Sequence, residues 1–154
     1  MILAGGYRKA SGDERGKIFD MYLAHTSHID NWDLVDCSAE YVVGAHLDAS
    51  DLRLLEKLAR STSLWERRIA IISTRRWIKE GDFAPTLAIA RLLLRDPHDL
   101  IHKASGWMLR EVADRDRRVA QGFLDEHVQE MPRTMLRYAI EKFPGVLRKR
   151  YLRR

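Results

Sequence analysis

The sequence has little of what marks a secreted or membrane protein. Of its 154 residues only one is a cysteine, Cys37, so no disulfide can form within the chain, which is typical of a reducing compartment. No apolar run is long enough to span a bilayer, and the opening "MILAGGYRKA" is too short and too polar for a signal peptide. These absences predict a cytoplasmic protein with no membrane partner.

The composition that remains is globular and basic. Apolar residues make up 45% of the chain and charged residues 32%, which excludes a disordered protein. A chain of 154 residues is long enough for one domain with a real core, but not comfortably for two. The net charge of +5 favours an anionic partner, with nucleic acid ahead of a membrane surface.

The alternating pattern of half-buried strands is absent, and apolar residues recur at helical spacing. The sequence therefore predicts an all-α fold. Start signals support it: Ser63 and Glu66 form a capping box, and Asp96 is the expected N-cap with Pro97 at the first helical position. The predicted helices cover residues 14–27, 31–44, 51–60, 63–79, 84–95, 98–114, 116–128 and 132–143.

Short loops join these predicted helices into four antiparallel hairpins. The second helices begin near Trp32, Trp65, Leu100 and Pro132, a recurrence of roughly 35 residues. This period predicts an α-solenoid of HEAT-like hairpins that spans residues 1–154 as a single domain. A plain helical bundle is the alternative, and the sequence separates the two only weakly.

The predicted second helix 63–79 carries a narrow basic stripe. At 100° per residue, Arg68, Arg75 and Lys79 fall in one wedge, and much of the remaining girth is apolar. An inner solenoid helix that exposes only a concave strip needs this pattern. The alternative, a solvated face on which long arginines cover apolar neighbours, explains the stripe equally well.

The predicted helix 98–114 places an indole among charges. Lys103, Trp107, Arg110 and Asp114 share one wedge opposite the apolar side. A tryptophan packed on a neighbouring hairpin is one interpretation, because tryptophans are usually mostly buried. An indole between Lys and Arg is also a means by which proteins contact sugars and bases.

A carboxylate on the same strip needs an explanation. Trp32 and Asp36, in "NWDLVD", lie about 40° apart at the edge of their helix's apolar arc, in phase with Arg68 and Trp107. A carboxylate opposes the binding of a polyanion. Asp36 therefore forms a structural ion pair with Arg68 or Lys103, or it faces a cation that forms during a reaction.

Four stretches resemble the AlkD-like DNA alkylation repair glycosylases, which are built of HEAT-like repeats. They lie between about Tyr22 and Phe143, and their order and spacing make the resemblance specific. The stretches are "NWDLVD", "LWERRIAII", "HKASGWMLREV" and "MPRTMLRYAIEKFP".

The resemblance implies excision of cationic N3- and N7-alkylated purines from double-stranded DNA, without extrusion of the damaged base into a pocket. In that family the W-x-x-x-D element matches Trp32 and Asp36, the second arginine of W-x-R-R matches Arg68, and the tryptophan of G-W-x-L-R-E matches Trp107. Asp36 would then stabilise the oxocarbenium ion on the deoxyribose, with the two indoles flanking the sugar. The expected DNA-binding cations are Arg68, Arg75, Lys79, Lys103 and Arg110.

The resemblance implies no cofactor and no metal. His98 and His102 have a spacing found in zinc sites, but Asp99 stands where the HExxH motif has glutamate. Members of the family usually begin with further helical hairpins, so this sequence is expected to be truncated at its N-terminus relative to them. A solenoid end without its cap should expose Ile2, Leu3 and Tyr7 and favour self-association through that end.

Two other classes of protein remain open. One is a non-catalytic binder of bent or branched DNA that uses the same strip. The other is a HEAT-type scaffold for protein interactions. The joint presence of Trp32, Asp36, Arg68 and Trp107 favours the glycosylase, because a scaffold needs no carboxylate beside two indoles.

Overall fold

The computed structural model describes the backbone of residues 2–153 and the side chains of residues 4–153. Within this part of the chain there are helices and no strand, which confirms the predicted all-α class. The helices are α1 (Ile2–Lys9), α2 (Gly12–Ala24), the 3₁₀ turn η1 (Thr26–His28), α3 (Trp32–Asp36), the π-helical turn η2 (Glu40–Gly44), α4 (Arg53–Ala59), α5 (Leu64–Ser73), α6 (Arg75–Ile78), α7 (Ala84–Leu92), α8 (Asp99–Arg115), α9 (Arg117–His127), α10 (Arg133–Ala139) and α11 (Gly145–Leu152).

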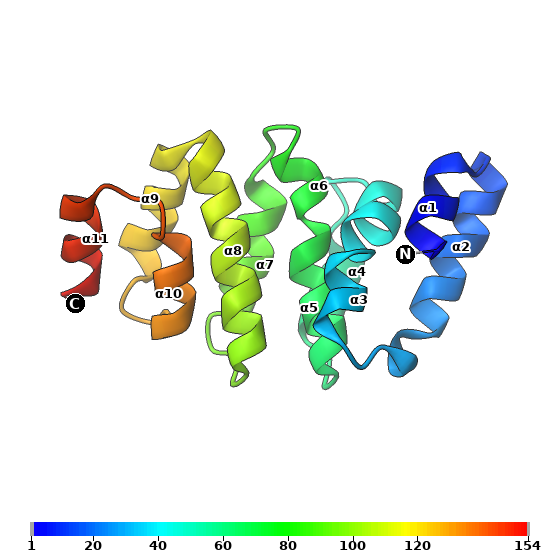
Figure 1. Ribbon diagram of the computed structural model, residues 1–154, viewed down its shortest axis with the longest axis horizontal. Helices are drawn as coiled ribbons and strands as arrows, with labels where there is room; N and C mark the ends of the chain where they lie inside the picture. The colour runs from blue at the N-terminus through cyan, green and yellow to red at the C-terminus, as the bar shows by residue number, and fades with distance from the viewer. Residues whose placement is uncertain (1, 154) are drawn as a thin grey trace.

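The second helices of successive hairpins stack in one row. Helix α3 packs on α5, α5 on α8, and α8 on α10, while α4, α7 and α9 lie behind them (Figure 1). The chain advances along the long axis, so its two ends lie at opposite ends of the molecule. This serial stacking is the arrangement expected of an α-solenoid. We call α3, α5, α8 and α10 the second-helix row.

One continuous hydrophobic core holds the row against the helices behind it. Leu55 of α4, Ile69 of α5, Ile89 of α7, Met108 of α8 and Leu136 of α10 are all fully buried and belong to this core. Burial of each such side chain stabilises the fold by roughly 1.5–3 kcal/mol. The row is therefore fixed by packing, and side chains on its open edge have defined positions.

The predicted helix 31–44 is interrupted in the structure. It ends as α3 at Asp36, and a tight turn at Cys37 and Ser38 precedes the π-helical turn η2. Ser38 Oγ donates a hydrogen bond to the carbonyl of Leu34 (2.5 Å), and such back-bonding by serine commonly bends a helix. The predicted helix 63–79 is likewise divided at Thr74, whose hydroxyl donates to the carbonyl of Ile71 (2.7 Å).

Two glycines allow the second helices to approach closely. A Cβ on Gly44 would lie 2.3 Å from the carbonyl oxygen of Ser73, and one on Gly106 would lie 2.5 Å from that of Met135. Both obstacles are backbone atoms, which cannot rotate away. Gly44 therefore sets the contact of η2 with α5, and Gly106 sets that of α8 with α10.

The sequence did not predict the first and last helices. Tyr7 of α1 was expected to be exposed, but it is buried, and its hydroxyl hydrogen-bonds His46 Nδ1 (3.0 Å). The expectation for Tyr7 is therefore wrong, because α1 packs on η2 and covers this side of it. Ile2 and Leu3, named in the same expectation, lie outside the described side chains.

The predicted start signals are partly correct. Ser63 caps α5 by accepting from the amide of Glu66, but the Glu66 carboxylate accepts from Thr26 instead of closing the box. Helix α8 is capped by His98, not Asp96. The Asp96 side chain accepts from the amide of His98 (2.8 Å) and from Arg67 (2.6 Å), so it holds the loop before the helix.

Candidate functional site

The carboxylate of Asp36 is paired with Arg68 across the contact of α3 with α5. Arg68 donates from Nε to Oδ1 (2.9 Å) and from Nη2 to Oδ2 (2.8 Å), a bidentate arrangement. Its third nitrogen, Nη1, donates to the carbonyl of Leu100 on α8 (2.6 Å). The side chain of Arg68 is 6% exposed and that of Asp36 is 15% exposed, so the carboxylate is the more open member of the pair.

This pairing bears on the role expected for Arg68. A guanidinium that is buried and uses three nitrogens on Asp36 and Leu100 has little surface left for a phosphate. The geometry therefore favours Arg68 as the residue that orients Asp36. It weighs against Arg68 as a direct ligand of DNA.

Trp32 stands one helical turn before Asp36 at the start of α3. Its side chain is exposed (52%), which is unusual for a tryptophan. Asn31 caps the helix, with its side-chain oxygen accepting from the amide of Asp33 (2.9 Å). The indole is thus carried by an ordered, capped turn and lies open to a ligand.

Trp107 on α8 is half-buried and is held from two sides. Its Nε1 donates to Glu111 Oε1 (3.1 Å), and the Arg75 guanidinium lies 5.5 Å from the centre of its ring. Arg75 also pairs with Glu111 (3.7 Å), so the three side chains form one cluster across the contact of α6 with α8. An indole held in this way has a fixed orientation.

Glu40 anchors this cluster from η2. It is a buried residue (3% exposed), and its carboxylate pairs with Arg75 Nη1 (3.0 Å) and with the ammonium of Lys79. Buried carboxylates are costly unless they are paired, and the two cations compensate for the burial of Glu40. Sequence reasoning missed Glu40, although it follows Asp36 by four residues and lies in the apolar stretch "AEYVVGA".

The two remaining predicted cations lie on α8. Lys103 pairs with Asp99 (2.9 Å), and the hydrogen bond to that carboxylate raises the pKa of Lys103. Arg110 pairs with Glu141. All five predicted DNA-binding cations therefore have carboxylate partners, and Lys79 and Lys103 are the most exposed of the five.

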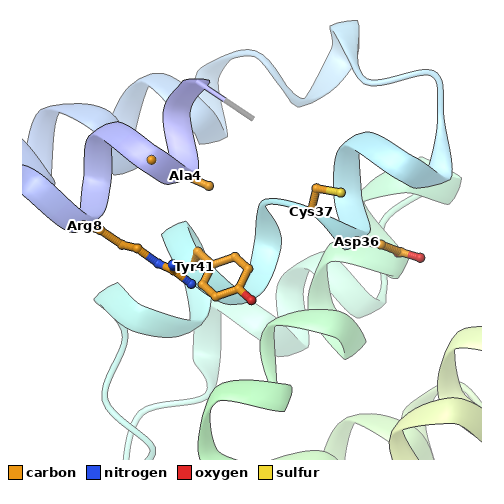
Figure 2. Close-up of a pocket in the computed structure, with 6 residues that line it drawn as sticks. Ala4, Arg8, Asp36, Cys37 and Tyr41 are labelled. Carbon is orange, nitrogen blue, oxygen red and sulfur yellow. The ribbon is translucent and has the colours of Figure 1, made fainter.

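A pocket of about 340 Å³ adjoins this region between α1 and η2. In Figure 2 the Arg8 guanidinium lies against the Tyr41 ring, 4.2 Å from its centre, and Asp36 points away from both. That direction agrees with the pairing of Asp36 with Arg68. The pocket is lined by Ala4, Gly5, Arg8, Asp36, Cys37 and Tyr41.

The structure thus brings the predicted residues to the second-helix row and the adjoining α6, but divides them into separate groups. Asp36 joins Arg68, Trp107 joins Arg75, Lys103 pairs with Asp99 on its own helix, and Arg110 pairs with Glu141. No group of three or more potential metal ligands occurs among the described residues. None of the helices described is both long and apolar enough to cross a membrane.

The fold is a helical solenoid. Paired charges and two indoles lie along its second-helix row and the adjoining α6. The family model described as "DNA alkylation repair enzyme" matches residues 2–143, so the chain belongs to that family. Membership assigns the protein to DNA repair and implies an interaction with DNA. Comparison with curated proteins and with solved structures gave no match.

Proposed function

We propose that the protein is a DNA glycosylase that hydrolyses the N-glycosyl bond of N3- and N7-alkylated purines in duplex DNA. The observation that carries the proposal is the bidentate Asp36–Arg68 pair, in which the carboxylate is the more exposed member. Family membership and the exposed Trp32 one turn away support it.

The proposed reaction begins with a base that is already a good leaving group because it is positively charged. As the bond from C1′ to the purine nitrogen breaks, its electron pair neutralises the base and leaves positive charge on the deoxyribose. The Asp36 carboxylate stabilises that charge. The oxygen of a water molecule then bonds to C1′, and the proton that it loses passes to Asp36 or to solvent.

Arg68 has a positioning role in this scheme. Its two hydrogen bonds fix the plane of the Asp36 carboxylate, and each oxygen keeps a further lone pair for the sugar or the water. Trp32 and Trp107 would flank the sugar with their electron-rich faces. The cluster of Arg75, Glu40 and Glu111 is expected to keep the Trp107 ring in place.

Direct contacts with phosphate are assigned to Lys79 and Lys103 first. These two lysines are the most exposed of the predicted cations, and each can exchange its carboxylate partner for a phosphate oxygen. Arg75 and Arg110 are less exposed, at 26% and 21% of their side chains, so we place them behind the lysines.

A non-catalytic DNA binder is the alternative function. The observation that favours it is that both oxygens of Asp36 already accept hydrogen bonds from Arg68, as in a purely structural ion pair. Release of a modified base distinguishes the two functions.

The test is incubation of the full chain with a duplex that contains N7-methylguanine, followed by chromatography for free base. We expect release from this duplex and none from a matched unmodified duplex. Binding of both duplexes without release of base would support the passive binder.

A further inference from the structure

The excess positive charge of the protein is concentrated at its C-terminal end. Residues 133–154 contain eight Lys or Arg and one acidic residue, Glu141, which gives this segment a net charge of +7. The whole chain carries +5, so residues 1–132 carry a net charge of −2. The basicity that favours an anionic partner therefore belongs to α10, α11 and the residues around them.

The cations of this end are largely free of carboxylates. Glu141 is engaged by Arg110, so it neutralises none of the segment's own cations. Lys142 and Arg150 pair with Asp114 and Asp125 of neighbouring helices. Four exposed cations of this segment have neither a carboxylate partner nor a side-chain hydrogen bond among the described residues. They are Arg137, Arg148, Lys149 and Arg153, and we call them the C-terminal basic surface.

The C-terminal helix α11, which carries Arg148 and Lys149 and ends before Arg153, is folded onto the protein. Tyr151 is buried, and its hydroxyl donates to Asp125 Oδ1 on α9 (2.8 Å). Its ring packs edge to face on that of Phe143, with 6.1 Å between the ring centres. Arg133 of α10 donates to the carbonyl of Leu152 (3.0 Å). Helix α11 is therefore tied to both α9 and α10, and its charges are held in defined positions.

The five predicted DNA-binding cations nearer the candidate site are, by contrast, all paired. Each of them has a carboxylate partner, so together they attract a polyanion only weakly. When Lys or Arg neutralises a phosphate, a counterion condensed on the duplex is released, and this release supplies most of the non-specific affinity for DNA. Arg137 lies on α10, the next member of the row after α8, and α11, with the other three cations on it or directly after it, lies beyond at the C-terminal end of the solenoid (Figure 1).

We propose that the C-terminal basic surface docks the sugar–phosphate backbone of the duplex on which the candidate site acts, at the end of the solenoid away from α3. The proposal extends the proposed function, because it names the surface that holds the same duplex. Its affinity is independent of sequence and of damage, since phosphates carry no base information. The C-terminal basic surface thus raises the affinity of the protein for any duplex, while the candidate site around Asp36 and Arg68 acts on the modified nucleotide.

The test compares a triple variant with the wild-type full chain on an unmodified duplex across a range of salt concentrations. The variant carries Arg137→Gln, Arg148→Gln and Lys149→Gln. Each cation that no longer neutralises a phosphate reduces the slope of log Kobs against log salt by about 0.9, so the three substitutions together reduce it by up to roughly 2.7. We expect weaker binding at low salt and a flatter slope.

A matched control removes the same charge elsewhere. Lys17, Lys57 and Arg118 are also exposed and also lack a carboxylate partner among the described side chains, but they lie on α2, α4 and α9. The triple Gln variant at these positions should bind duplex with nearly the wild-type slope. Equal effects of the two triple variants would overturn the proposal, because net charge alone would then explain the binding.

Two further measurements separate this proposal from its alternatives. Flotation with phosphatidylserine vesicles tests a membrane surface as partner; vesicle binding that the C-terminal triple variant loses, with duplex binding unchanged, overturns the proposal. Release of N7-methylguanine is assayed separately. A protein that releases no base but binds duplex through this surface refutes the proposed function and supports the docking surface.

Discussion

Replacement of Asp36 by asparagine tests the chemistry most directly, because it keeps the shape of the side chain and removes its charge. If the carboxylate stabilises a developing cation, removal of such a preorganised interaction costs about 3 kcal/mol in the transition state, or roughly a hundredfold in rate. The measurement is a single-turnover excision rate on a duplex that contains N7-methylguanine. It is made at a temperature at which the variant is fully folded.

The structure also predicts a cost in stability for the same variant. Removal of one partner from a buried ion pair destabilises a protein by roughly 3–5 kcal/mol. Asparagine keeps one oxygen for Arg68, and Arg68 keeps the carbonyl of Leu100, so we expect a smaller cost of about 2 kcal/mol. For a chain of this size that corresponds to a fall in Tm of roughly 4–8 °C.

Two further variants separate the two costs. The double variant Asp36→Asn with Arg68→Gln leaves no unpaired charge, so it should recover much of the fall in Tm without recovering excision. Asp51→Asn is the matched control, because Asp51 pairs with Arg53 on the surface (2.5 Å) with both side chains exposed. Asp51→Asn should change neither the excision rate nor Tm measurably. Wild-type excision by folded Asp36→Asn would refute the catalytic assignment.

Three other predictions concern the framework. Glu40→Gln should lower the free energy of unfolding by roughly 2 kcal/mol, because Arg75 and Lys79 lose a charged partner while Arg75 keeps Glu111. Urea denaturation measures this, and an unchanged midpoint would contradict it. Gly106→Ala should be strongly destabilising, because the added Cβ would clash with backbone atoms of α10. Gly122→Ala has open space around it and should raise the free energy of unfolding by up to about 1 kcal/mol. Equal melting temperatures of the two variants would contradict the packing argument. Burial raises the pKa of Tyr22 to about 12, above its value of 10.0 in the unfolded chain, so its stabilisation is complete below pH 10 and is lost as the pH rises toward 12. Tyr22→Phe should flatten that alkaline decline in denaturation curves taken at successive pH values.

The sequence predicted the interior of the fold better than its ends. Second helices with a continuous apolar face were recognisable because burial on that face leaves a periodic pattern. Helix α1 contains two adjacent glycines, Gly5 and Gly6, which disfavour a helix by local propensity. Helix α11 has no apolar stripe and depends on Tyr151 and its hydrogen bond to Asp125. Tertiary interactions of this kind leave no periodic signal in one sequence.

For the candidate site, the sequence predicted a shared row and left Arg68 or Lys103 as a partner for Asp36, of which the structure shows Arg68; it did not predict the other pairs. Helical phase gives the direction of a side chain around its own axis, and that sufficed to place Arg68 and Asp36 toward the same strip. Which carboxylate meets which cation depends on how far one helix is shifted along the next. That shift follows from close packing at positions such as Gly44 and Gly106, which helical phase does not describe. Glu40 and Glu111 were missed for this reason.

The pairing resolves the difficulty raised by a carboxylate on a surface that faces DNA. A free Asp36 would repel the phosphate backbone, but a carboxylate that accepts two hydrogen bonds from Arg68 belongs to a pair with no net charge. The pair still has a direction, with its negative end as the more exposed one, so it can stabilise a cation at short range without repelling a polyanion at long range. On the proposed assignment, long-range attraction then has to come from elsewhere on the protein. The unpaired cations of α10 and α11 supply it at a distance from Asp36, where they do not oppose the positive charge that develops on the sugar.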